Sequence, residues 1–237
     1  MASIALARRT ALTFWQKMNL GMAAFILFGF AQFAARGLVD YSHAPLEFHL
    51  HGMLMVLWLA LLVGQSLLAG RGTMALHMAM GWASVIMVPA IVVIASLTSL
   101  AALSGGLVPP FFTPAYFLAL VHVSMVLFAV MVMAAVVLRE DAGWHKRLMV
   151  GSTVLLLEPA LGRVLPMPLI MPWGEWLSMA IQLGVVGLVV RHDRRELGRV
   201  HPATIAAALA VVTSHLVIEI MARIPAWQDL AAAIVHG

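Results

Sequence analysis

Residues 114–138 read PAYFLALVHVSMVLFAVMVMAAVVL, a stretch without a single Lys, Arg, Asp or Glu. An apolar run of about 20 residues is long enough to cross a bilayer as a helix. Further runs along the chain have the same character, and with this one they predict about seven transmembrane helices, at roughly 18–36, 47–70, 74–103, 114–138, 144–165, 175–190 and 202–222. The predicted fold class is therefore all-α, a polytopic membrane protein.

The composition of the whole chain agrees with that stretch. Of the 237 residues, 63% are hydrophobic and only 10% are charged, whereas about a quarter of the residues in a soluble domain are charged. We expect residues 1–237 to form a single integral membrane domain in contact with membrane lipid, because the loops are too short for a soluble domain. Cysteine is absent, which excludes disulfides and iron–sulfur clusters.

The distribution of basic residues predicts the orientation. With seven crossings, Arg36, Arg163 and Arg223 fall on one side of the membrane. The other 11 of the 14 basic residues fall on the side of the N-terminus: Arg8, Arg9, Lys17, Arg71, Arg139, Lys146, Arg147, Arg191, Arg194, Arg195 and Arg199. Because basic loops stay in the cytoplasm, we expect a cytoplasmic N-terminus and an external C-terminus, in a bacterial inner membrane. The same excess explains the pI near 10.3 without nucleic acid as a partner.

Two hydrophobic hairpins, at about 45–90 and 114–165, repeat one pattern of histidines. The first hairpin carries His51 and His77, and the second carries His122 and His145. Met-Val-Leu begins at position 55 in one and at 125 in the other, and a serine follows each second histidine by seven residues. Such self-similarity indicates two copies of one unit. We therefore predict a four-helix core made of the second to fifth helices.

Helix geometry places these four histidines in two layers. At a rise of ~1.5 Å per residue, His51 and His122 lie roughly 25–30 Å from the cytoplasmic face, and His77 and His145 lie close to it. We call His51 and His122 the outer pair, and His77 and His145 the inner pair. Two imidazoles that face each other across a four-helix bundle are suited to hold haem b.

Small residues follow both inner histidines. Gly81 and Gly151 lie one to two turns further along their helices. They would leave room for a macrocycle, or they would simply let two membrane helices approach closely. Both interpretations stay open.

Two motifs resemble those of a known family. Phe48-His-Leu-His51-Gly-Met-Leu-Met55-Val resembles the second-helix motif of the two-haem membrane cytochromes of the b561 type, and Leu76-His77-Met-Ala-Met-Gly81 is similar to their third-helix motif. The likeness covers roughly residues 45–165. It implies one haem on the outer pair and one on the inner pair, and electron transfer from a quinol or small reductant to an acceptor on the opposite face. The pattern also resembles a group of uncharacterised bacterial membrane proteins.

Buried charge offers a competing site. Glu158 and His215 fall at about the same depth as the outer pair, so His51, His122, His215 and Glu158 are the candidate ligands of a transition metal ion such as iron, zinc or copper. The protein would then be a metal-binding protein or a metalloenzyme.

A third alternative is a proton-coupled transporter, because carboxylates at bilayer depth are costly and are usually functional or paired. Its path would include Glu158, Arg163, His215 and Glu219. The structural alternative is that Glu158 pairs with Arg163, and Glu219 with Arg223 four residues on. The sequence leaves open whether the protein is an enzyme, such as a membrane oxidoreductase, and whether it forms a homo-oligomer.

Overall fold

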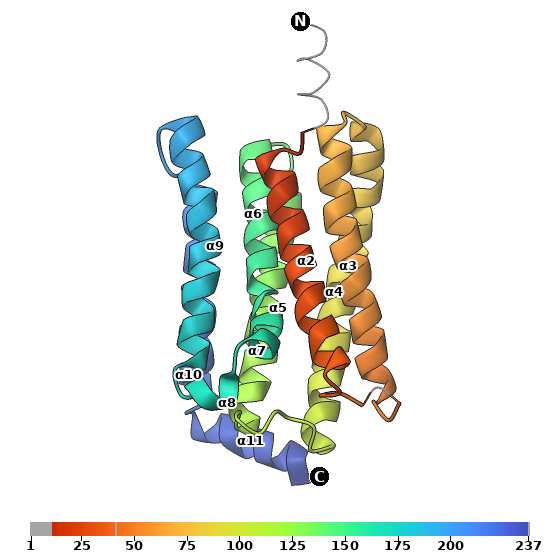
Figure 1. The fold of residues 1–237 in the computed structure, drawn as a ribbon, viewed down its shortest axis with the longest axis vertical. Helices are drawn as coiled ribbons and strands as arrows, with labels where there is room; N and C mark the ends of the chain where they lie inside the picture. Colours follow the sequence, from red (N-terminus) through yellow and green to blue (C-terminus); the bar gives the residue numbers. More distant parts are fainter. Residues whose placement is uncertain (1–10, 41, 237) are drawn as a thin grey trace, which may run out of the picture.

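The structure is a computed structural model that describes residues 11–40 and 42–236, so Arg8 and Arg9 lie outside the described part. Its long helices run side by side between two ends (Figure 1). The helices are α2 (Phe14–Ala35), α3 (Leu46–Gly70), α4 (Met74–Ser104), α5 (Pro114–Val137), α6 (Ala142–Leu155), α7 (Glu158–Val164), α8 (Met167–Ile170), α9 (Gly174–Leu197), α10 (Pro202–Met221) and α11 (Pro225–His236).

Six helices of the described chain, α2, α3, α4, α5, α9 and α10, are long and apolar enough to cross a membrane. The prediction of an all-α polytopic membrane protein is confirmed. The fifth predicted span, 144–165, is not one continuous helix, because α6 ends at Leu155 and α7 begins at Glu158. Pro159 lies in the first turn of α7, where its missing N–H does no harm, whereas inside α6 it would have removed a backbone hydrogen bond.

Together, α6 and α7 take the place of the fifth predicted span. In Figure 1, α6 and α7 follow one another from one end of the bundle toward the other. The turns at 71–73, 138–141 and 198–201 lie at one end, which we call the basic end because it carries Arg71, Arg139 and Arg199. The short helix α8 and the terminal helix α11 lie at the opposite end.

Side-chain caps set several helix starts. The hydroxyl of Thr13 caps α2, that of Thr113 caps α5, and the carboxylate of Asp141 accepts bonds from the first backbone N–H groups of α6. The start of α4 is different, because the Thr73 hydroxyl donates to the carbonyl of Leu68 at 2.9 Å and caps nothing.

The end of α9 differs from the prediction. The helix continues seven residues past position 190 and carries Arg191, Arg194 and Arg195 on its last turns, where a loop was expected. It stops at Gly198, whose φ of +69° is readily accessible only to glycine. The helix α11 was not predicted at all. It lies across the end of the bundle (Figure 1), where the Trp227 indole donates to the carbonyl of Ala115 at 2.9 Å.

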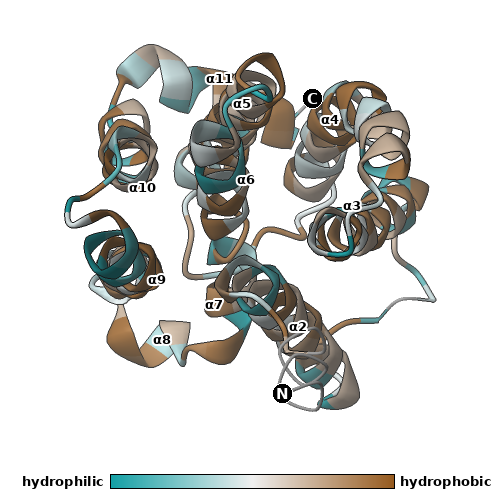
Figure 2. Ribbon diagram, turned by 90° about the horizontal axis from the view of Figure 1, so that it is seen from above, coloured by the Kyte–Doolittle hydropathy of each residue, from teal (hydrophilic) through white to brown (hydrophobic). Residues whose placement is uncertain are grey.

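The predicted four-helix core is formed by α3, α4, α5 and α6, each packed on the next in chain order. Seen from above, α2 closes the group against α3 and α6, while α9 and α10 stand to one side (Figure 2). At the centre, the rings of Trp58 and Phe128 meet edge to face with centroids 5.1 Å apart. Both side chains are buried, so α3 and α5 touch across the middle of the bundle.

Candidate functional site

The inner histidines lie next to each other at the basic end. His77 is on the first turn of α4 and His145 on the first turn of α6, and each helix starts directly after a short turn. Their ring centroids are 6.1 Å apart and the ring planes are at 87°. The structure therefore brings together the two side chains that the repeat predicts as the inner pair.

Backbone carbonyls fix the orientation of both inner rings. His77 donates through Nδ1 to the carbonyl of Gln65 at 3.2 Å, and His145 donates through Nδ1 to the carbonyl of Ala135 at 2.8 Å. A carbonyl can only accept, so the proton of each neutral ring is on Nδ1 and the lone pair is on Nε2. Neither Nε2 has a hydrogen bond to any described residue. In addition, the Gln65 side chain donates to the carbonyl of His77 at 3.0 Å.

The two rings lie close enough together that both could hold one metal centre through their Nε2 atoms. A histidine that binds metal usually donates its other N–H to a carbonyl or carboxylate, which sets the tautomer and the ring orientation. Both inner rings already have that second bond.

The outer histidines are arranged differently. His122 uses both nitrogens, Nδ1 for the carbonyl of Leu118 at 2.8 Å and Nε2 for the Ser96 hydroxyl at 2.9 Å. His51 has a buried Nδ1 without a hydrogen-bond partner among the described residues. No ring contact joins the two within that part of the chain. The structure thus holds one close histidine pair where the repeat predicts two.

The four candidate metal ligands do not converge. His215 bonds through Nε2 to the side-chain oxygen of Gln182 at 2.9 Å, and Glu158 lies beside Glu175. Among residues 11–40 and 42–236, no group of three or more His, Cys, Asp or Glu side chains could hold a metal ion. The described residues thus hold no cluster of His51, His122, His215 and Glu158.

Gly151 has a packing role. A Cβ at this position would lie 2.6 Å from the Cβ of Ala207 and 2.6 Å from Cε of Met131. The residue therefore allows α6 to approach α10 closely, and it leaves no room for a macrocycle. Gly81 is less crowded, since a Cβ there would meet only the Gln65 side chain, at 3.5 Å.

His201 belongs to a structural network that the sequence did not reveal. Asp193 accepts from Arg147 Nε at 2.9 Å, from the backbone N–H of His201 at 3.1 Å and from the Thr204 hydroxyl at 2.5 Å. These contacts tie α6, α9 and α10 together around a buried ion pair. Burial, and then the nearby Arg147, lower the pKa of His201, so its neutral ring accepts the backbone N–H of Ala203 as a helix cap.

The acidic residues at the opposite end are partly as predicted. Glu219 and Arg223 form the expected pair at 2.8 Å. Arg163 donates to the carbonyl of Pro159 at 2.8 Å and lies over the ring of Phe30. The neighbour of Glu158 that sequence reasoning missed is Glu175, which is only 3% exposed. The sequence does contain a signal for this buried polar face, namely the helical spacing of Glu175, Ser178 and Gln182, which places the three residues on one side of the helix.

The fold and this site define a class: an all-α polytopic membrane protein with a close histidine pair at the basic end of its core. Comparisons of the chain with models of known families, with curated proteins and with solved structures gave no match. The function is therefore inferred from the side chains of the site.

Proposed function

We propose that His77 and His145 bind one b-type haem, and that the protein transfers electrons in the membrane. The observation that supports this most is the state of the two imidazoles. Each Nδ1 is bonded to a backbone carbonyl, and each Nε2 lacks a hydrogen bond within the described residues. When bound, a haem with two histidine ligands takes up and releases single electrons at its iron.

The number of protein ligands favours haem over a bare metal ion. Zinc sites use at least three protein ligands, and no third His, Cys, Asp or Glu joins the inner pair in the described chain. A haem would need no third protein ligand, so His77 and His145 would suffice to hold it. Only the inner pair has this arrangement, since His122 Nε2 is bonded to Ser96. We therefore expect one haem per chain.

A lipid-soluble quinol is the class of electron donor that suits the surroundings. Around His77, α4 exposes Met78 and Trp82, which are 58% and 60% accessible. In a membrane such side chains contact lipid, so a molecule dissolved in the bilayer reaches the edge of the site. The bundle itself shields the rings on the other side, where α5 and α6 pack together. The acceptor would be a protein or small molecule at the membrane surface.

The proposal includes an orientation of the bundle in the membrane. The basic end lies in the cytoplasm of a bacterial cell, which puts α11 on the external side of the inner membrane. Basic loops are retained in the cytoplasm during insertion, and Arg71, Arg139 and Arg199 all lie at that end. The inner pair then lies near the cytoplasmic surface.

The absorbance spectrum of the purified protein tests the function. Protein from cells with an ample haem supply should show a Soret band and, after reduction with dithionite, the α-band of b-type haem. His77→Ala and His145→Ala should each remove the haem, whereas the same change at the exposed His49 should not. Folded wild-type protein without a Soret band would refute the proposal, as would full haem content in His145→Ala. Loss of half of two haems in His122→Ala would show that the outer pair binds one as well.

A further inference from the structure

The buried face of α9 is polar in the half of the bundle away from the basic end. Glu175, Ser178 and Gln182 follow one another on this face at helical spacing, with exposures of 3%, 0% and 1%. The next residues on the face are Val186 and Val189. Polar groups in such a place are costly unless they are paired, so each of the three needs a partner.

Only Gln182 is satisfied by protein groups. It donates to the carbonyl of Val154 at 3.1 Å and accepts from His215. The Ser178 hydroxyl and both carboxyl oxygens of Glu175 are buried and have no partner of good geometry among the described residues. An ionised carboxylate can only accept hydrogen bonds, so a buried Glu175 that receives none is costly unless it carries a proton.

Glu158 adds a second buried carboxyl group to this region. It begins α7 and is 6% exposed, and its carboxyl group lies within hydrogen-bonding reach of that of Glu175. Two carboxylates side by side in a low-dielectric environment cannot both carry a charge, and such pairs share one proton. That proton would donate the hydrogen bond that Glu175 lacks. Arg163, on α7, is near enough for its charge to act on Glu158.

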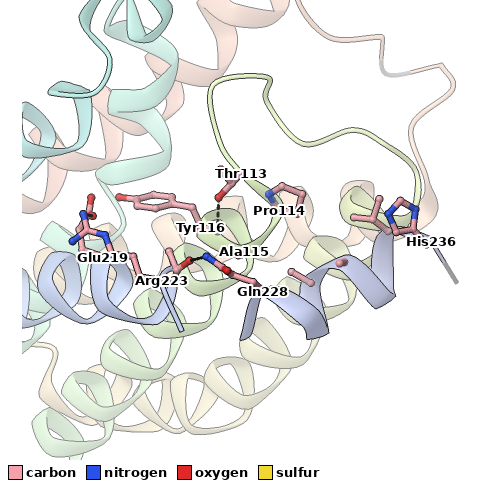
Figure 3. A pocket seen from close by; sticks show the side chains of 12 residues that line it. Thr113, Pro114, Ala115, Tyr116, Glu219, Arg223, Gln228 and His236 are labelled. Carbon is pink, nitrogen blue, oxygen red and sulfur yellow. Dashed lines mark hydrogen bonds and ion pairs between the residues drawn. The ribbon is translucent and has the colours of Figure 1, made fainter. Parts of the chain in front are cut away.

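A cavity lies in the same half of the bundle as this pair. It has a volume of about 460 Å³ and lies between the start of α5, the end of α10 and α11; its lining includes Tyr116, Glu219 and Arg223. Figure 3 shows the Tyr116 hydroxyl directed toward the Glu219–Arg223 ion pair. The hydroxyl has no hydrogen-bond partner among the described residues, and it is close enough to Glu158, Glu175 and Glu219 for all three charges to act on it.

We propose that Glu158 and Glu175 form a proton-binding site that holds one shared proton and exchanges it with the aqueous phase beside α11 through the cavity at Tyr116. Uptake joins one proton to one carboxylate oxygen and makes one carboxylic acid, and release is the reverse. The site does not depend on haem, because it lies at the opposite end of the bundle from the inner pair.

Infrared spectroscopy tests the shared proton directly. At neutral pH the wild-type protein should show the carbonyl band of one protonated carboxylic acid, because every other acidic residue is partly exposed or ion-paired: Asp40, Glu47, Glu140, Asp141, Asp193, Glu196, Glu219 and Asp229. The double variant Glu158→Gln with Glu175→Gln, whose amides imitate the protonated pair in size and hydrogen bonding, should lose the band. Glu196→Gln is the control and should keep it. A wild-type spectrum without the band, or a band that survives in the folded double variant, would overturn the proposal.

The route is tested by hydrogen exchange. Transfer of the protein into D₂O should shift the carboxylic band as deuterium replaces the shared proton. Tyr116→Phe keeps the ring stacked on Phe112, at a centroid distance of 5.4 Å, but removes the hydroxyl, and it should slow the shift several-fold. Thr73→Val removes a hydroxyl at the basic end and should leave the rate unaltered. An unchanged rate in Tyr116→Phe would refute the route through the cavity.

Discussion

A single hydrogen bond decides which nitrogen of an imidazole is free to bind a ligand. The sequence does not reveal that hydrogen bond. The repeat predicted that His77 and His145 share a layer, and both do lie at helix starts 6.1 Å apart. It also predicted that His122 would face His51, but the Ser96 hydroxyl from α4 occupies His122 Nε2. Spacing along a helix fixes depth, whereas the facing direction depends on how each helix is rotated in the packed bundle.

Gly151 should be more sensitive than any other glycine of the core. Gly151→Ala places a Cβ 2.6 Å from Ala207 Cβ, which forces α6 and α10 apart and should cost about 1–3 kcal/mol. Gly184→Ala adds the same methyl to α9 where nothing lies within 4 Å, so the higher helix propensity of alanine should keep or raise stability. Thermal unfolding in detergent compares the two. Equal shifts of both variants in one direction would contradict the packing role.

At the scale of elements, apolar length predicted most helices and local chemistry set their ends. The apolar run at 114–138 gave α5 nearly to the residue, and α6 begins two residues before the predicted position 144. The break at 156–157 was not foreseen, although Pro159 marked it, because helices often tolerate proline by bending. The burial of Glu175 depends on α9 packing against α7. The spacing of residues within one helix says little about which helices, distant in the sequence, pack against it.

The ion pair of Arg147 and Asp193 should hold α6, α9 and α10 together. Arg147→Ala leaves a buried, uncompensated carboxylate, and breaking such a pair costs about 3–5 kcal/mol. Replacing both partners, Arg147→Met with Asp193→Leu, removes the unpaired charge and should recover most of the lost stability. The exposed Arg139, changed to Ala, is the control. Denaturant or thermal unfolding in detergent measures all three. Arg147→Ala with the stability of the control would show that the pair contributes little.

For the whole molecule, the two ends of the described chain lie at opposite ends of the bundle (Figure 1), so the proposed orientation places them on opposite sides of the membrane. The absence of cysteine makes this easy to measure, because any introduced cysteine is the sole thiol. Asp229→Cys on α11 should react with a membrane-impermeant maleimide in intact spheroplasts. Glu140→Cys, in the turn before α6, should react only after lysis. Both positions are exposed. Reaction of both from outside would contradict an odd number of crossings, and the reverse pattern would invert the orientation.

The rings of Trp58 and Phe128 meet at the middle of the bundle, and Val132 on α5 and Val186 on α9 are also buried. In electrical terms this layer is an insulator of low polarisability between two ends that can carry charge. A membrane voltage falls most steeply where polar groups and water are scarcest, so most of the field across the protein acts on this layer. Protons need a continuous chain of hydrogen bonds to pass such a region, whereas electrons tunnel through hydrocarbon. A proton that crosses the middle of this protein would therefore meet its main barrier in this layer.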